Sequence, residues 1–182
     1  MDVLTYSSFA ADAKPKMVNG KIVWALSNDI MFNDFKNCAS FLTDIIFFEY
    51  RIINDDRSVV SLDKILEMIP NIKSCLFYYD FHMIQDATMK NICQLKNLQN
   101  LDLFVVANIP EVVNVGDLST FIKYHADTKI KFSFNDEISD GYKVQLDALI
   151  DTIITSEAPH CLIEYFGQKK EKFNIMHKNY LF

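Results

Sequence analysis

The chain has 182 residues, of which 50% are hydrophobic and 13% aromatic, with only 4 glycines and 4 prolines. This length is sufficient for one domain with a sizeable core, and the apolar content excludes a disordered, collagen-like or linker-rich chain. The formal net charge is −6, from 18 Lys and Arg against 24 Asp and Glu. An acidic chain with scattered basic residues lacks the positive surface of a general nucleic-acid-binding protein.

The sequence also predicts the cellular environment. No cationic segment followed by an apolar run opens the chain, so we expect no signal peptide. No apolar stretch reaches the roughly 18 residues that a membrane-spanning helix needs. Cys38, Cys75, Cys93 and Cys161 are far apart and form no Cys-x-x-Cys pair, which is typical of reduced thiols. We therefore expect one domain over residues 1–182, in the cytoplasm or the nucleus.

The first half of the chain alternates predicted strands and helices. In chain order these are a strand around Ile22–Leu26, a helix over 28–42, a strand over 42–47, a helix over 61–69 and a strand over 72–77. Ser61 is a candidate N-cap for the second helix, and Pro70 ends it.

The second half continues the same alternation. In chain order it contains a helix over 86–95, a strand over 98–103, a helix over 116–125, a strand over 130–134, a helix over 139–155, a strand over 160–165 and a helix over 168–182. Asp86 and Asp117 are candidate N-caps. The helix over 139–155 is the clearest, because its apolar residues form one stripe: Tyr142, Leu146, Leu149, Ile150 and Ile153.

The strands resemble one another in pattern. Leu98-x-x-Leu101-x-Leu103 has the spacing of a leucine-rich repeat, and the other strands give weaker copies. The middle apolar positions are 45, 75, 101, 130 and 163, at intervals of 30, 26, 29 and 33 residues. Leucine-rich repeats have about 20–29 residues. We therefore predict an α/β fold, an irregular leucine-rich-repeat-like solenoid with a parallel sheet and helices on the convex side. The alternative is a doubly wound open sheet.

Motifs for catalysis are absent from the sequence. The chain lacks the P-loop, the nucleophile elbow, His-Glu-x-x-His and paired cysteines, so we predict a non-enzymatic protein with no cofactor and no metal. The acidic stretches NDDRS and FNDEISDG are interpreted as turns and helix caps. The competing hypothesis is an enzyme without a known motif, in which His82 meets Asp80 or His125 meets Asp127.

One face of the predicted sheet is a candidate partner-binding surface. If Leu42, Ile45 and Phe47 point into the core, alternate residues point to the open face. The candidate partner-binding residues are Asp44, Phe48, Leu76, Tyr78, Asn100, Asp102, Phe104, Lys129 and Lys131. Aromatic side chains in such a strip can anchor a partner protein, and the charged residues can orient it. The alternative is that the N-terminal segment or the last helix covers this face.

Three stretches of the sequence resemble the F-box-associated, FTH-type domain of nematode F-box proteins: SLDKILEMIPNIKSCLF (61–77), the segment from LKNLQNLDLF to QLDALID (95–151), and APHCLIEYFG (158–167). The resemblance implies a leucine-rich-repeat-like module that recognises protein substrates for a ubiquitin ligase. Residues 1–60 lack the Leu-Pro pair that usually opens an F-box. The resemblance therefore implies a relative without an F-box, acting as a ligase adaptor or as a stand-alone recognition module. A separate interpretation is an antidote-like regulatory protein that acts by binding one partner.

Overall fold

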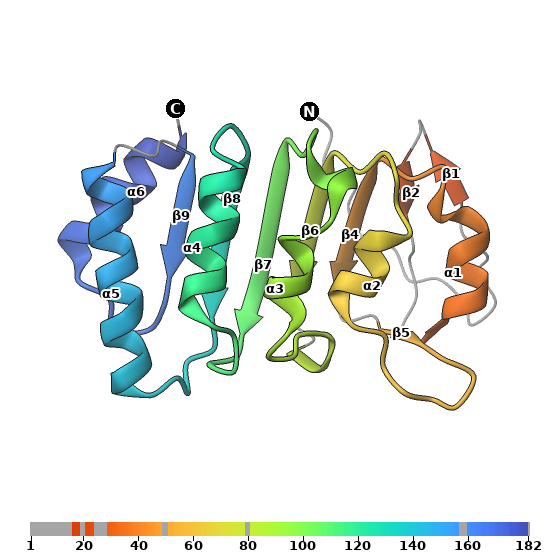
Figure 1. Cartoon of the computed structure of the whole chain (residues 1–182), viewed down its shortest axis with the longest axis horizontal. Coiled ribbons are helices and arrows are strands. Elements are labelled where there is room, and N and C mark those ends of the chain that lie inside the picture. Colours follow the sequence, from red (N-terminus) through yellow and green to blue (C-terminus); the bar gives the residue numbers. More distant parts are fainter. Residues whose placement is uncertain are drawn as a thin grey trace.

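A computed structural model describes residues 16–18, 21–23, 29–48, 51–78, 81–156 and 160–181, in which strands and helices alternate (Figure 1). The first part contains β1 (Lys16–Val18), β2 (Lys21–Val23), β3 (Ile30–Met31), α1 (Phe32–Ala39), β4 (Asp44–Phe48), β5 (Ile52–Ile53) and α2 (Leu62–Glu67). The second part contains β6 (Ser74–Tyr78), α3 (Thr88–Ile92), β7 (Leu103–Ile109), α4 (Val115–Tyr124), β8 (Lys129–Phe134), α5 (Asp140–Thr155), β9 (Cys161–Glu164) and α6 (Lys170–Leu181). Short 3₁₀ turns lie at Phe81–Met83 and Lys96–Leu98.

The main sheet is parallel and has the strand order β4-β6-β7-β8-β9. This order follows the chain without the reversal that marks a doubly wound sheet. Each connection carries a helix, and right-handed crossovers in one direction place all of these helices on the same side. Figure 1 shows α2, α3, α4 and α5 side by side over one face of the sheet. The fold is therefore mixed α/β with a parallel main sheet, as predicted.

Two smaller sheets accompany the main one. β1 and β2 form an antiparallel pair, and β3 pairs with β5 in parallel. β2 also lies against β4 at the start of the main sheet. The predicted strand around Ile22–Leu26 is present as β2 up to Val23, and its remaining residues lie outside the described part of the chain.

The core lies between the sheet and α2–α5. Two rows of side chains cross the strands in register and face these helices: Ile45, Cys75, Phe104, Ile130 and Cys161, then Phe47, Phe77, Val106, Phe132 and Ile163. All of them are buried. The rings of Phe47 and Phe77 are 5.3 Å apart, and those of Phe104 and Phe132 are 6.1 Å apart. Aromatic side chains at alternate strand positions thus hold the sheet against its helices.

The same backbone contact recurs where successive strands begin. The carbonyl of Thr43 accepts hydrogen bonds from the amides of Lys73 and Ser74, at 2.6 and 3.1 Å. The carbonyl of Lys73 accepts in the same way from Asp102 and Leu103, at 2.7 and 3.1 Å. Thr43, Lys73 and Asp102 are therefore equivalent positions of a structural repeat.

This equivalence corrects the predicted register of β7. The positions that match Leu42, Ile45 and Phe47 are Leu101, Phe104 and Val106, so the Leu98-x-x-Leu101-x-Leu103 template lies three residues too early. The placement of Phe104 on the open face is wrong, because its side chain is 0% exposed in the core. Leu103, predicted to be core, is partly exposed instead. The cause is Leu98, which is buried from a 3₁₀ turn before the strand rather than from the strand itself.

The predicted helices are present, although their caps differ. α5 begins after Ser139, whose hydroxyl accepts a hydrogen bond from the Tyr142 amide at 3.3 Å, and its predicted apolar stripe is buried. α4 is capped by Asn114, whose side chain accepts from the Gly116 amide at 2.7 Å, and not by Asp117. α3 begins one residue later than predicted, and Ala87 stands at its N-cap instead of Asp86.

Candidate functional site

The side of the main sheet that faces away from α2–α5 is called the second face here. Alternate strand residues point to it because successive side chains of a strand lie on opposite faces. The register places these residues on it: Asp44, Ile46, Ser74, Leu76, Tyr78, Leu103, Val105, Lys129, Lys131, Ser133, Leu162 and Glu164. The burial of these side chains changes from one end of the sheet to the other.

At the β8–β9 end, α6 packs along the sheet. The ammonium of Lys129 lies 4.6 Å from the centre of the Tyr180 ring, and Leu162 is only 2% exposed. Lys131 pairs with Glu164 at 2.8 Å, and the Ser133 hydroxyl donates to the same carboxylate oxygen at 2.9 Å. The predicted partner residues Lys129 and Lys131 are thus engaged by groups of the chain itself.

At the opposite end, apolar side chains reach the surface. Ile46 in the middle of β4 is 45% exposed, whereas Leu76 and Tyr78 of β6 are half-buried. These three residues are called the β4–β6 patch below. Asp44 lies at its edge and is half-buried, and its carboxylate accepts a hydrogen bond from the Thr43 hydroxyl at 2.8 Å. Predicted Phe48 pairs with Tyr78 along the backbone, but its side chain lies outside the described part.

The remaining predicted residues lie at the rim where β6, β7 and β8 begin. Asn100 and Asp102 are exposed and line a hollow of about 550 Å³ together with Lys73, Tyr124 and Asp127. Tyr124 at the end of α4 is 75% exposed. Tyr124 is not among the predicted partner-binding residues, although its position just outside the buried stripe of α4 indicates an exposed aromatic side chain.

The two histidine–aspartate pairs of the enzyme hypothesis are not shown to meet. His125 and Asp127 line the same rim hollow, but the His125 ring packs on Phe121 with centroids 4.4 Å apart. Burial lowers the pKa of His125, so this side chain favours its neutral form. Asp80, the expected partner of His82, lies outside the described residues.

Within the described ranges, the clusters of acidic and sulfur-containing residues have structural roles. No group of three or more His, Cys, Asp or Glu side chains there could hold a metal ion. Asp56 accepts from the backbone amide and hydroxyl of Ser58, and Asn135 accepts from the Glu137 amide, as expected for turns. Burial raises the pKa of Cys75 to about 12, so this thiol stays protonated. Cys161 is also buried, whereas Cys38 and Cys93 are half-buried.

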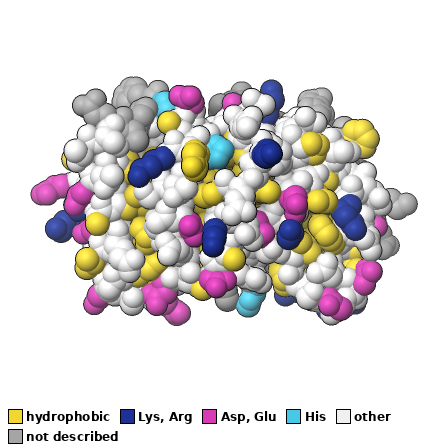
Figure 2. Space-filling view, viewed as in Figure 1, with side chains coloured by type: hydrophobic (Ala, Val, Ile, Leu, Met, Phe, Trp, Pro, Cys, Tyr) yellow, Lys and Arg dark blue, Asp and Glu magenta, His cyan; other side chains and the backbone are white. Residues whose placement is uncertain are grey.

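The helix side carries a mixed surface. Figure 2 shows hydrophobic, basic and acidic side chains interspersed over α2–α5, without a large area of one charge. None of the described helices is both long enough and apolar enough to cross a membrane. The β4–β6 patch and the rim hollow are therefore the two features that we take as the candidate site.

The chain matches no protein-family model, no curated protein and no solved structure. Its function must therefore be argued from its own residues.

Proposed function

We propose that this chain is a non-enzymatic protein-interaction module that binds a partner protein through the β4–β6 patch. The observation that carries the proposal is the 45% exposure of Ile46 in the middle of a strand of a parallel sheet. Both faces of a parallel sheet are ordinarily covered, and their strands are buried. Exposed apolar side chains on such a strand favour a surface that is covered by a partner.

The architecture supports a leucine-rich-repeat-like module. The parallel strands follow chain order with α2–α5 on one side, and the backbone contact at Thr43, Lys73 and Asp102 recurs between strands. Repeat proteins of this kind expose an extended face for partners. The resemblance to FTH-type domains agrees with this interpretation and supports a relation to substrate receptors of F-box ubiquitin ligases. We place the protein in the cytoplasm or nucleus, in agreement with its free cysteines.

The patch and the rim would have different roles in binding. Ile46, Leu76 and Tyr78 would supply the apolar centre, where most of the binding free energy of an interface usually lies. Asp44, Asn100 and Asp102 would form a polar rim that orients the partner and affects the association rate. Phe104 has no part in this surface because it is buried.

The test is affinity purification from source cells with three forms of the chain: wild type, Ile46→Asp and Val144→Asp. Val144 is the matched control, because it is also an exposed aliphatic residue, at 69%, but lies on α5. We expect one stoichiometric partner to be retained by wild type and Val144→Asp and lost with Ile46→Asp. If all three folded forms recover the partner equally, the β4–β6 patch is not the binding surface.

The identity of the recovered proteins decides between the two forms of the proposal. A Skp-type adaptor and a cullin recovered with the chain would support a ubiquitin-ligase adaptor. One stoichiometric partner without these subunits would support a stand-alone regulatory protein.

A further inference from the structure

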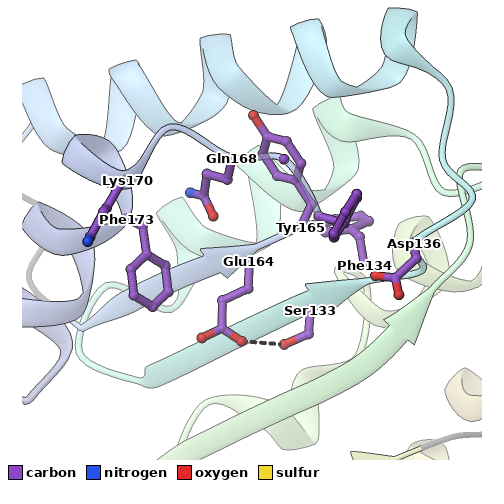
Figure 3. A pocket seen from close by; sticks show the side chains of 10 residues that line it. Ser133, Phe134, Asp136, Glu164, Tyr165, Gln168, Lys170 and Phe173 are labelled. Atoms are coloured by element: carbon purple, nitrogen blue, oxygen red, sulfur yellow. Dashed lines mark hydrogen bonds between the residues drawn. The ribbon is translucent and has the colours of Figure 1, made fainter.

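A second hollow lies at the opposite rim, where β8 and β9 end and α6 begins (Figure 3). It has a volume of about 480 Å³, within the range of about 300–1,000 Å³ that is typical of ligand pockets. Its walls include Phe134, Glu164, Tyr165, Phe166, Gln168 and Phe173. This hollow is separate from the β4–β6 patch, which lies on β4 and β6 at the other end of the sheet.

Four of the residues that line the hollow are aromatic, and two of these are fixed by contacts behind the hollow. The Tyr165 hydroxyl donates a hydrogen bond to Asp147 at 2.6 Å. The Phe134 ring packs against Tyr142 with centroids 5.7 Å apart. Phe166, in contrast, is 69% exposed and gains burial only if something covers it. The hollow therefore offers a preformed apolar surface with one uncovered aromatic ring.

Glu164 and Gln168 both line the hollow and both have unused hydrogen-bonding capacity. One oxygen of Glu164, Oε2, accepts from both Lys131 and Ser133, which holds the carboxylate in place. The other oxygen, Oε1, has no hydrogen-bond partner among the described residues. Gln168 Nε2 is buried without an acceptor, which is unfavourable for a polar N–H group. One acceptor thus lies at the hollow, and one unpaired donor is buried on Gln168, a residue of its wall.

We propose that this hollow binds a short peptide segment through an apolar side chain and the adjoining backbone amide. The apolar side chain packs on Phe166 and Phe173, and the peptide N–H donates to Glu164 Oε1. The peptide carbonyl accepts from Gln168 Nε2, once the side-chain torsions of Gln168 turn this amide into the hollow. A backbone amide presents both a donor and an acceptor, which matches this pair of groups. The lining carries charges of both signs, Asp136 and Glu164 against Lys170, and Glu164 is already paired with Lys131, so the hollow suits an uncharged amide.

The probe for this site is N-acetyl-phenylalaninamide, which carries an aromatic side chain and peptide amides, followed by ¹⁵N NMR on the full chain. We expect affinity near the millimolar range, with shifts confined to the C-terminal rim and including the side-chain amide of Gln168. 3-Phenylpropan-1-ol lacks the amide and should bind more weakly. Shifts spread over the whole chain, or equal affinity for the two compounds, would overturn the proposal.

Three variants test which residues bind the probe. Gln168→Leu should keep or increase the stability of the fold, because it removes an unpaired buried donor, yet weaken probe binding about fivefold. Phe166→Ala should abolish detectable binding, whereas Ile175→Ala, a 45% exposed residue of α6 outside the hollow, should not change it. Unchanged affinity of folded Gln168→Leu would overturn the role of the amide.

Two further outcomes separate this site from other interpretations. Adenosine also offers donors, acceptors and an aromatic face, and tighter binding of adenosine at the same residues would overturn the peptide assignment. Ile46→Asp should leave probe binding unchanged, because Ile46 lies on β4, away from the hollow. If the test of partner binding at the β4–β6 patch fails, the measured binding of the probe to this hollow still stands.

Discussion

The two faces of the main sheet are buried by different means. On the helix side, Ile45, Cys75 and Phe104 in successive strands are all buried to 4% exposure or less, and α2–α5 lie over this face (Figure 1). On the second face, Ile46 is 45% exposed at one end and Leu162 is 2% exposed at the other. Adjacent residues of one strand, Ile45 and Ile46, thus differ sharply in burial.

The difference shows which part of the fold closes each face. The helix side is closed by local connections that recur with every strand. Of the described helices, α6 covers the second face, and it does so from the β9 end. α6 is also tied to α5, because Lys172 pairs with Asp151 at 2.7 Å and with Asp147 at 3.6 Å. The helix side is therefore buried by the repeating strand–helix units. The second face is buried where α6, the C-terminal helix, packs on it.

The largest expected effect comes from a comparison of two adjacent residues of β7, Phe104 on the helix side and Leu103 on the second face. Phe104→Ala should lower the free energy of unfolding by about 3–5 kcal/mol, as is usual for removal of a buried aromatic ring. The ring lies 4.7 Å from Phe121 and 6.1 Å from Phe132, measured between centroids. Leu103→Ala should have a clearly smaller effect, because Leu103 is partly exposed. Urea unfolding of both variants measures the contrast, and equal losses would contradict the observed register.

The β7 register also shows how far the sequence could predict this fold. The alternation of strands and helices, the parallel sheet and the apolar stripe of α5 all follow from periodicity within single elements. The register of β7 does not, because Leu98, Leu101 and Leu103 fit the repeat template as well as Leu101, Phe104 and Val106 do. Only the hydrogen bonds between strands decide between the two alignments.

A second comparison lies within the second face. Leu162→Ala should lower the free energy of unfolding by about 2–5 kcal/mol, the usual range for a fully buried leucine. Ile46→Ala should change it by less than about 1 kcal/mol, because almost half of this side chain is already in water. Guanidinium unfolding of both variants gives the difference. A large loss for Ile46→Ala would mean that the β4–β6 patch is core rather than a binding surface.

The candidate site was predicted less well than the fold, for a physical reason. Strand alternation correctly placed Asp44, Leu76 and Tyr78 on the second face. Asn100 and Asp102 were predicted on this face by the wrong register of β7, and they lie before the strand, at the rim. The sequence pattern does not show that the last helix returns across the sheet. Contacts between residues as distant in the chain as Lys129 and Tyr180 depend on tertiary packing, which periodicity does not encode.

The contact between Lys129 and Tyr180 tests how α6 is held on the second face. A double-mutant cycle with Lys129→Gln and Tyr180→Leu should give a coupling energy of about 0.5–2 kcal/mol, as expected for a cation–π contact that is partly shielded from water. Hydrogen exchange of the α6 amides should rise in each single variant. Additive effects on stability would show that Lys129 and Tyr180 do not interact, and α6 would then be held by Lys172 and its apolar residues.

The smallest expected effect concerns His125, which lies on the helix side at the end of α4. Burial of its half-exposed ring lowers its pKa in the folded chain below the ordinary value of 6.5. The unfolded chain therefore binds this proton more readily, so stability falls as the pH drops below about 6.5. His125→Gln removes the titrating group and should weaken this pH dependence, measured as the difference in free energy of unfolding between pH 7.5 and pH 5.5. If wild type and variant show the same difference, the pKa of His125 is the same in the folded and unfolded chains. Its packing on Phe121 would then not shield the ring from water at this end of the helix side.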